Sequence, residues 1–172
     1  MSAKGISRDI QSAAGSLEGI CQVTGRHEAG NYAYAIVVSR FNEHLTTALL
    51  QSAVACLTQH GAKPTQIKVV WVPGAFEIPV VANKLAQAGK HHAIITLGVV
   101  LEGETLHARL ISNSLVRGIT MTSRENNLPI IDGVVTGNTL KQAEKRCLSG
   151  EDSRGWYAAL AAMEMAHVMN AL

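Results

Sequence analysis

The chain has 172 residues, of which 47% are hydrophobic, enough for one folded domain with its own core and too many for a disordered chain. The formal net charge is only +2, and the Lys and Arg residues are scattered without a basic stripe or aromatic platform, so no nucleic-acid partner is expected. No apolar run approaches the ~20 residues of a membrane helix, so no membrane partner is expected either. Small anionic substrates stay open, because they need only a local site.

The cysteines favour a reducing compartment. The chain has three of them, and no two form a CxxC pair: Cys21, Cys56 and Cys147. This uneven spacing does not predict a disulfide framework or a zinc site. We therefore expect a cytoplasmic protein, and we interpret Cys56 as a core residue because it lies on the apolar side of a predicted helix.

Residues 1–30 differ in composition from the rest of the chain. They are rich in Ser, Gly, Ala and Gln and lack the hydrophobic segment of a secretory signal. An organellar transit peptide is the alternative, and Asp9 and Glu18 argue against it. We expect an N-terminal arm over 1–30, partly flexible, whose last part can pair with a sheet, and one α/β domain over 31–172.

From Tyr32 onward, short apolar or β-branched runs alternate with segments of helical spacing. We expect strands at 34–39, 67–72, 93–101 and 130–135. We expect helices at about 43–60, 77–88, 106–126, 139–147 and 154–171. Asn42 is the predicted cap of the first helix, and Thr139 with Gln142 has the spacing of a capping box for the fourth.

This alternation predicts an α/β fold. Strands that are each followed by a helix indicate three layers, α/β/α, with a four-stranded parallel sheet in flavodoxin-like order. The run 93–101 is the most apolar and is expected near the centre of the sheet. The loops after the strands would then open at one edge of the sheet, where such folds bind ligands.

The segment from Gly98 to His107, which begins in the third expected strand and continues into the loop after it, carries the strongest functional signal. It is typical of a buried strand, a turn and a helix start, and the unpaired N–H groups of a first helical turn favour an anion. His107 would lie in that turn, and His is the side chain best suited to moving protons near neutral pH. Glu102 and Glu104 suit an anion site only if their carboxylates point away from it.

The first two loops offer groups that can bind a ligand. Phe41 follows the first strand, where its ring can lie against a planar ligand or act as a hydrophobic staple for the next helix, and its position favours neither. Glu77 follows Pro73-Gly74 and can accept hydrogen bonds from a ligand's hydroxyls. Taken alone, however, a Glu in a first turn is more simply explained as complementing the helix dipole.

The fourth loop, 132–138, leads on to Arg146. Arg is a natural bidentate partner of phosphate, although among charged neighbours it would ordinarily be a solvated surface residue. The pair His91-His92 lies at the opposite sheet edge without nearby carboxylates, so we interpret it as surface and expect no metal site. Walker A, GxGxxG and GxSxG motifs are absent.

Taken together, these segments resemble the lumazine synthase family (6,7-dimethyl-8-ribityllumazine synthases) over about Tyr34 to Leu172. The resemblance is carried, in chain order, by Arg40-Phe41-Asn42, Val72-Pro73-Gly74-Ala75-Phe76-Glu77-Ile78-Pro79, Gly98-Val99-Val100-Leu101 with Gly103-Glu104-Thr105 and His107, Gly133-Val134-Val135-Thr136, Gln142-Ala143 with Arg146, and Ala161-Ala162-Met163-Glu164-Met165-Ala166. Each segment alone is weak, but all of them in this order are highly specific.

The resemblance implies a transferase of riboflavin biosynthesis. Such an enzyme joins 5-amino-6-(D-ribitylamino)uracil to 3,4-dihydroxy-2-butanone 4-phosphate and releases 6,7-dimethyl-8-ribityllumazine and phosphate, with no metal and no cofactor. Family members assemble as pentamers or as sixty-subunit icosahedral shells with sites between subunits. Riboflavin synthase is an expected partner.

The resemblance also implies a role for each candidate residue. His107 would be the catalytic proton carrier. The pyrimidine and the ribityl chain would contact Phe41, Ala75, Phe76, Glu77, Val99, Val100, Leu101 and the residue at position 132, which is Asp132 in this chain. The phosphate would be bound by Glu104, Thr105 and, from a neighbouring subunit, Arg146.

Three positions near the expected site depart from the family pattern. Asp132 stands where an aromatic usually covers the pyrimidine from the next subunit, Glu102 replaces Arg or Lys, and Ala108 replaces Phe or Tyr. These departures motivate an alternative, a divergent paralogue that keeps the oligomeric assembly but binds another ligand or catalyses weakly. A generic flavodoxin-like phosphate-binding module is a third hypothesis, but it would not require all the motifs at once.

Overall fold

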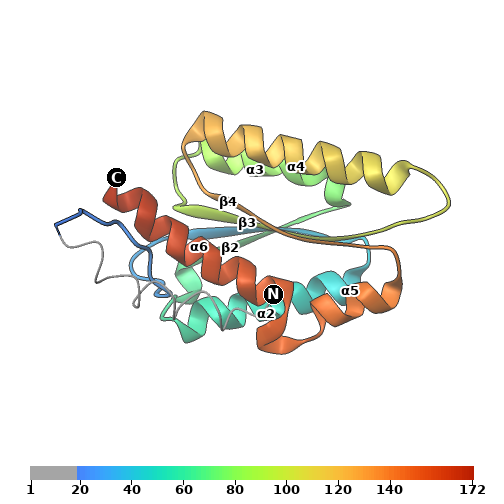
Figure 1. Ribbon diagram of the computed structural model, residues 1–172, viewed down its shortest axis with the longest axis horizontal. Helices are drawn as coiled ribbons and strands as arrows, with labels where there is room; N and C mark the ends of the chain where they lie inside the picture. The colour runs from blue at the N-terminus through green and yellow to red at the C-terminus, as the bar shows by residue number, and fades with distance from the viewer. Residues whose placement is uncertain (1–18) are drawn as a thin grey trace.

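The computed structural model describes residues 19–172 (Figure 1). Within this range the chain forms a four-stranded parallel sheet in the order β2-β1-β3-β4. Its strands are β1 (Tyr34–Ser39), β2 (Ile67–Val72), β3 (Ala93–Leu101) and β4 (Ile130–Gly137). The predicted flavodoxin-like order is confirmed, and β3 lies between β1 and β4 as its apolar sequence predicts.

Helices cover both faces of the sheet. One face carries α3 (Ile78–Gln87) and α4 (His107–Asn126), and the other carries α2 (Glu43–Gln59), α5 (Leu140–Cys147) and α6 (Arg154–Ala171) (Figure 1). Short 3-10 turns precede β2, α3 and α6: η3 (Pro64–Gln66), η4 (Ala75–Glu77) and η5 (Gly150–Asp152). The predicted three-layer α/β/α architecture is confirmed.

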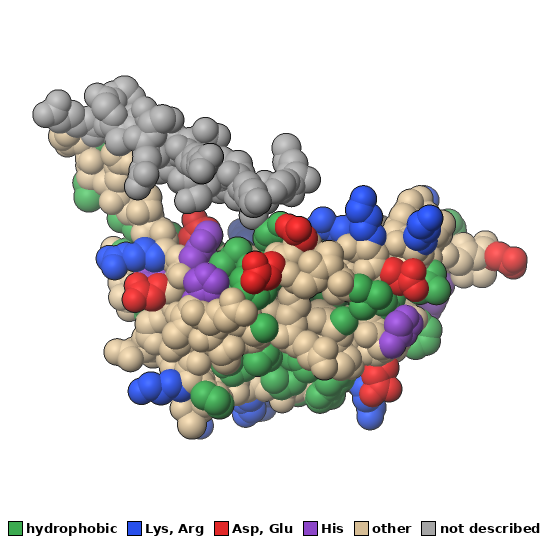
Figure 2. Space-filling model, turned by 90° about the horizontal axis from the view of Figure 1, so that it is seen from below, with side chains coloured by type: hydrophobic (Ala, Val, Ile, Leu, Met, Phe, Trp, Pro, Cys, Tyr) green, Lys and Arg blue, Asp and Glu red, His purple; other side chains and the backbone are tan. Residues whose placement is uncertain are grey.

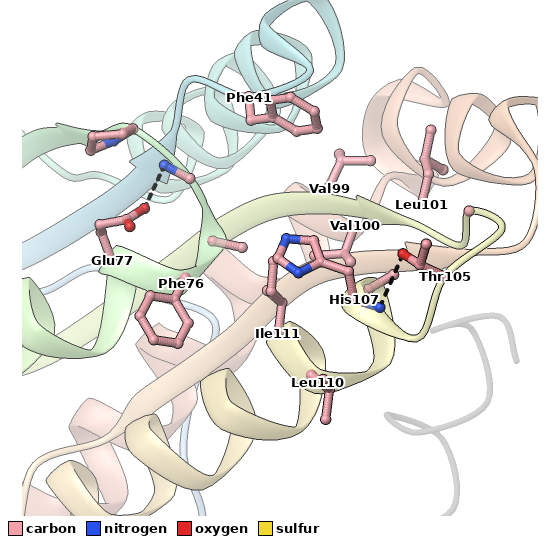
Figure 3. Close-up of a pocket in the computed structure, with 15 residues that line it drawn as sticks. Phe41, Phe76, Glu77, Val99, Val100, Leu101, Thr105, His107, Leu110 and Ile111 are labelled. Atoms are coloured by element: carbon pink, nitrogen blue, oxygen red, sulfur yellow. Dashed lines mark hydrogen bonds between the residues drawn. The ribbon is translucent and has the colours of Figure 1, made fainter.

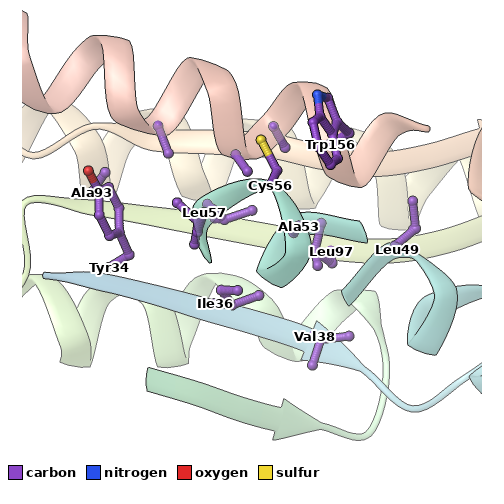
Figure 4. Close-up of a cluster of buried hydrophobic side chains, with 14 of the residues drawn as sticks. Tyr34, Ile36, Val38, Leu49, Ala53, Cys56, Leu57, Ala93, Leu97 and Trp156 are labelled. Atoms are coloured by element: carbon purple, nitrogen blue, oxygen red, sulfur yellow. The ribbon is translucent and has the colours of Figure 1, made fainter. Parts of the chain in front are cut away.

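The two faces of the sheet build separate cores, because successive strand residues point to opposite sides. In β1, Ile36 and Val38 face α2 and α6, where Trp156 joins the same cluster (Figure 4). Ala35 and Val37 face the other core, under α3 and α4. Every residue of β1 is therefore buried, which explains its nearly continuous apolar sequence.

The two predicted helix caps differ in outcome. Thr139 caps α5, since its Oγ1 accepts a hydrogen bond from the Gln142 N–H (3.3 Å). Asn42 is the N-cap residue of α2, as predicted, and its carbonyl accepts the Leu45 and Thr46 N–H groups. Its side chain, however, makes no cap hydrogen bond, and its backbone is left-handed, with φ at 61°. Its amide Nδ2 instead donates to the Val99 carbonyl of β3 (3.2 Å).

The end of the predicted arm lies against the domain without joining the sheet. Residues 19–33 contain no strand, so the expected pairing of the arm's last part is not seen in this chain. The Ala29 N–H donates to the His60 carbonyl (2.8 Å), and His167 Nε2 donates to the Glu28 carbonyl (2.9 Å). The part of the predicted arm before residue 19 lies outside the described residues.

The face shown in Figure 2 carries basic, acidic and hydrophobic side chains interspersed rather than sorted by charge. Within residues 19–172, none of the helices is both long and apolar enough to cross a membrane. The same part of the chain contains no group of three or more His, Cys, Asp or Glu side chains placed to hold a metal ion.

Candidate active site

A cavity of about 760 Å³ opens where the strands end. The loops after β1, β2 and β3 and the first turns of α4 form its walls (Figure 3). Most of the predicted site residues line it: Phe41, Ala75, Phe76, Glu77, Val99, Val100, Leu101, Thr105 and His107. These residues meet because the carboxyl ends of parallel strands share one edge of the sheet.

Backbone hydrogen bonds hold the loop that carries Phe41 against the end of β2. The Arg40 N–H donates to the Val72 carbonyl (2.8 Å), and the Phe41 N–H donates to the Pro73 carbonyl (3.1 Å). The Phe41 side chain is 68% exposed and lines the cavity, so it does not pack as a hydrophobic staple against α2. Of the two interpretations of this residue, the exposed ring favours contact with a ligand.

The loop after β2 folds tightly around Glu77. Its Oε2 accepts a hydrogen bond from the Gly74 N–H (2.9 Å), which closes the turn η4 just before α3. Ala75 is buried in this turn, whereas the Phe76 ring is 59% exposed and faces the cavity. The Glu77 carboxylate thus both orders the turn and lines the cavity, where it can accept further hydrogen bonds.

His107 is the first residue of α4 and so lies in the first helical turn, as predicted, and its side chain lines the cavity. Its backbone N–H donates to Thr105 Oγ1 (3.4 Å), so the threonine sits at the amino end of the helix (Figure 3). The N–H groups of this first turn favour an anion. Glu102 and Glu104 are exposed and do not line the cavity, so the phosphate contact predicted for Glu104 stays a prediction.

Besides Glu104, two predicted site residues do not line this cavity in the same chain. Asp132, on β4, lines a separate cavity of about 400 Å³ between α4 and β4. Its Oδ1 accepts from the Val134 N–H (3.0 Å), and its carbonyl accepts from the Arg154 guanidinium. Arg146 is exposed in the last turn of α5. The roles predicted for Asp132 and Arg146 need a second subunit and stay predictions.

Comparison with known proteins agrees with the geometry of this cavity. The family model of 6,7-dimethyl-8-ribityllumazine synthase matches residues 31–170. The chain is also 41% identical, over 155 residues, to the 6,7-dimethyl-8-ribityllumazine synthase of Prochlorococcus marinus (strain MIT 9211). The matched region covers 87% of this chain and 98% of the relative. The chain belongs to the lumazine synthase family. The predicted family resemblance is therefore confirmed.

The cavity also includes residues that the sequence pattern did not assign to a site. Ala108, Leu110 and Ile111 of α4 complete its apolar wall. Leu110 and Ile111 follow His107 by three and four residues, the spacing that places side chains on one helix face. The same spacing marks any helix that packs on a core, so it could have suggested these residues only once His107 was placed in a cavity.

The buried cysteines of this lumazine synthase are expected to be chemically inert. Burial raises the pKa of Cys56 to about 12 and that of Cys147 to about 11, even though Arg146 pulls the latter down. Both groups therefore remain thiols at pH 8, and only the thiolate is nucleophilic. We expect iodoacetamide to alkylate the exposed Cys21 alone in the folded protein and all three cysteines in denaturant, as read by peptide mass spectrometry. Alkylation of folded Cys147 as fast as Cys21 would contradict this expectation.

Proposed function

We propose that this chain condenses 5-amino-6-(D-ribitylamino)uracil with 3,4-dihydroxy-2-butanone 4-phosphate to give 6,7-dimethyl-8-ribityllumazine. The observation that carries the proposal is the convergence of Phe41, Glu77 and His107 on one cavity in a chain of this family. The exposed aromatic ring suits a planar substrate ring, and the carboxylate can accept hydrogen bonds from a polyhydroxylated chain. The histidine can carry the protons that a condensation reaction moves. The proposed reaction requires no metal or cofactor, as the family resemblance implies.

The Phe41 side of the cavity suits the pyrimidine. Its exposed ring offers a face on which a planar heterocycle can stack. Val99, Val100 and Leu101 at the end of β3 line the cavity, and their backbone groups would bind the edge of the ring. Glu77 would accept hydrogen bonds from the ribityl hydroxyls. The pyrimidine substrate would thus lie along the carboxyl ends of β1, β2 and β3.

His107 would serve as the proton carrier in this arrangement. The amine of one substrate and the carbonyl of the other are reactive together, so orienting them is the main task of the enzyme. Imine formation, loss of phosphate and ring closure each require a proton to be removed from one reacting atom and delivered to another. An imidazole beside the reacting atoms can take up and return these protons, and no activated nucleophile is needed.

The phosphate would bind at the amino end of α4. The His107 N–H is bonded to Thr105 Oγ1, but the next N–H groups of the first turn and the Thr105 hydroxyl are suitable donors. Among the described residues, no Lys or Arg lines the cavity, so the charge of a phosphate lacks a cationic partner within one chain. Arg146 of a neighbouring subunit would supply that partner. This arrangement requires a homo-oligomer, for which light scattering would distinguish a pentamer from a sixty-subunit shell.

Two further expectations rest on the sequence alone. A cytoplasmic location follows from the cysteine pattern, and riboflavin synthase follows as a partner from the family resemblance. Both stay predictions. Co-purification of riboflavin synthase with this protein would test the partner, and fractionation of the source cells would test the location.

The alternative of a divergent paralogue is not favoured. Glu102, one of the two residues that motivate it, does not line the cavity that holds His107. The 41% identity to a lumazine synthase over most of both chains also argues for the family's reaction. Incubating the purified protein with both substrates and following lumazine fluorescence tests the proposal. A rate no higher than that of the uncatalysed condensation would overturn it.

Arg146→Ala should weaken binding of the butanone phosphate specifically. Loss of a charge-assisted hydrogen bond, about 1.5–3 kcal/mol, corresponds to a KM for this substrate about tenfold to a hundredfold higher. The KM for the pyrimidine should stay unchanged, since Phe41 and β3 would hold that substrate. Arg124→Ala, at an exposed position in the last turn of α4, is the matched control and should match the wild type. An unchanged KM for the phosphate in Arg146→Ala would remove Arg146 from the site.

A further inference from the structure

Asn42 adopts an unusual conformation for a residue that precedes a helix. Such residues normally have an extended backbone, and their side chain accepts a hydrogen bond from the first turn. Asn42 instead has φ 61° and ψ 46°, and its side chain makes no cap bond to α2. The left-handed region is uncommon for non-glycine residues, and although Asn enters it more readily than most, such residues cluster at functional sites. The hydrogen bond that the Asn42 side chain makes to β3 indicates what that function is.

The Asn42 side chain bonds to the part of β3 that extends beyond β1. Pairing between β1 and β3 ends at Val38 and Leu97, whereas β3 continues to Leu101. The Asn42 Nδ2 donates to the Val99 carbonyl at 3.2 Å. The amide therefore supplies a donor to β3 where β1 no longer runs beside it. Val99 itself lines the cavity.

The same residue sets the position of Phe41. With a 68% exposed side chain, Phe41 is held mainly by its backbone rather than by packing. Hydrogen bonds from Arg40 and Phe41 attach the loop to the end of β2, and the Asn42 amide attaches it to β3. Removal of this side-chain bond would leave the loop bonded to β2 and, through the Asn42 carbonyl, to α2, but no longer to β3. The separation between the Phe41 ring and the β3 backbone therefore depends on Asn42.

We propose that Asn42 is a positioning residue for the pyrimidine subsite, where it fixes the Phe41 ring relative to the end of β3. This inference rests on the proposed function, because it assumes that the ring and the strand hold the pyrimidine between them. Asn42 acts through Phe41 and Val99, by means of its left-handed backbone and its Nδ2 hydrogen bond. The phosphate subsite at the amino end of α4 does not depend on it.

The chain contains a matched control for this residue. Asn127 is the other non-glycine residue with a positive φ among the described residues, at 48°. It is exposed at the C-cap of α4, about 30 Å along that helix from His107. Glycine tolerates a positive φ at both positions, so Asn42→Gly and Asn127→Gly should both fold. Asn42→Asp and Asn127→Asp keep the shape of the side chain, but the carboxylate cannot donate to a carbonyl.

The test is the effect of these four variants on the two KM values, measured by lumazine fluorescence, with thermal unfolding as a check on folding. We expect Asn42→Gly and Asn42→Asp to raise the KM for the pyrimidine substrate about fivefold or more, as the loss of one hydrogen bond predicts. The KM for the butanone phosphate should stay within about twofold. Both Asn127 variants should match the wild type.

Two results would overturn the inference while leaving the proposed function intact. One is an active wild type whose Asn42 variants match the Asn127 variants. The other is an equal rise of both KM values in the Asn42 variants, which would indicate a general loss of structure rather than positioning of one substrate. A wild type no faster than the uncatalysed reaction would overturn the proposed function and, with it, this inference.

Discussion

Replacing His107 with alanine should lower kcat by about a hundredfold or more, the usual contribution of a positioned general acid–base group. The imidazole lies in the cavity and is exposed, so its removal opens no space in either core. The thermal unfolding midpoint should therefore stay the same, and both KM values should change little. Steady-state lumazine fluorescence at saturating concentrations of both substrates measures the effect.

His44→Ala is the control for this variant. His44 is exposed in the first turn of α2 and does not line the cavity, so its removal should leave turnover at the wild-type value. If His107→Ala and Arg146→Ala both kept wild-type kinetics, the assignment of the site would be wrong. If only His107→Ala kept them, the cavity would still bind the substrates but proton transfer would depend on another group or on water.

Replacing Gly155 with alanine should destabilise the fold by about 3 kcal/mol or more. A Cβ at this position would lie 2.2 Å from the backbone oxygen of Leu49 and 3.1 Å from its Cα. The obstacle is backbone of α2, which a rotamer change cannot move aside. Helices α2 and α6 would have to separate, and this would disturb the core cluster that they share with the sheet. Denaturant unfolding measures the change in the free energy of unfolding.

Gly103→Ala provides the comparison for Gly155→Ala. No atom lies within 4 Å of a Cβ built on Gly103, and its φ is not positive, so the free energy of unfolding should change by less than about 0.5 kcal/mol. Equal stability of the two variants would contradict the close packing of α6 against α2.

The sequence was sufficient to predict the architecture because its local signals agree with one another. The apolar run 93–101 became β3 with the predicted bounds, and the alternation of strands with amphipathic segments allowed only a parallel sheet. The convergence of Phe41, Glu77 and His107 then followed from topology, since all three come directly after strands that end at the same edge.

The remaining features depend on contacts between distant segments, which a single sequence does not reveal. Asn42 has the residue type and position of a cap, but its amide bonds to β3, which lies 57 residues further along the chain. Leu110 and Ile111 have ordinary helical spacing, and only the loop around Phe76 turns their helix face into a cavity wall. The roles of Asp132 and Arg146 would involve a second subunit, so neither the sequence pattern nor one folded chain determines them.

The most direct test of the central claim is a crystal structure of the protein with 5-amino-6-(D-ribitylamino)uracil alone, which cannot react without the second substrate. We predict the pyrimidine ring against Phe41, with its edge at Val99 to Leu101 and the ribityl chain along the turn from Ala75 to Glu77. Binding of the pyrimidine anywhere outside this cavity, in a protein that forms lumazine, would contradict the account.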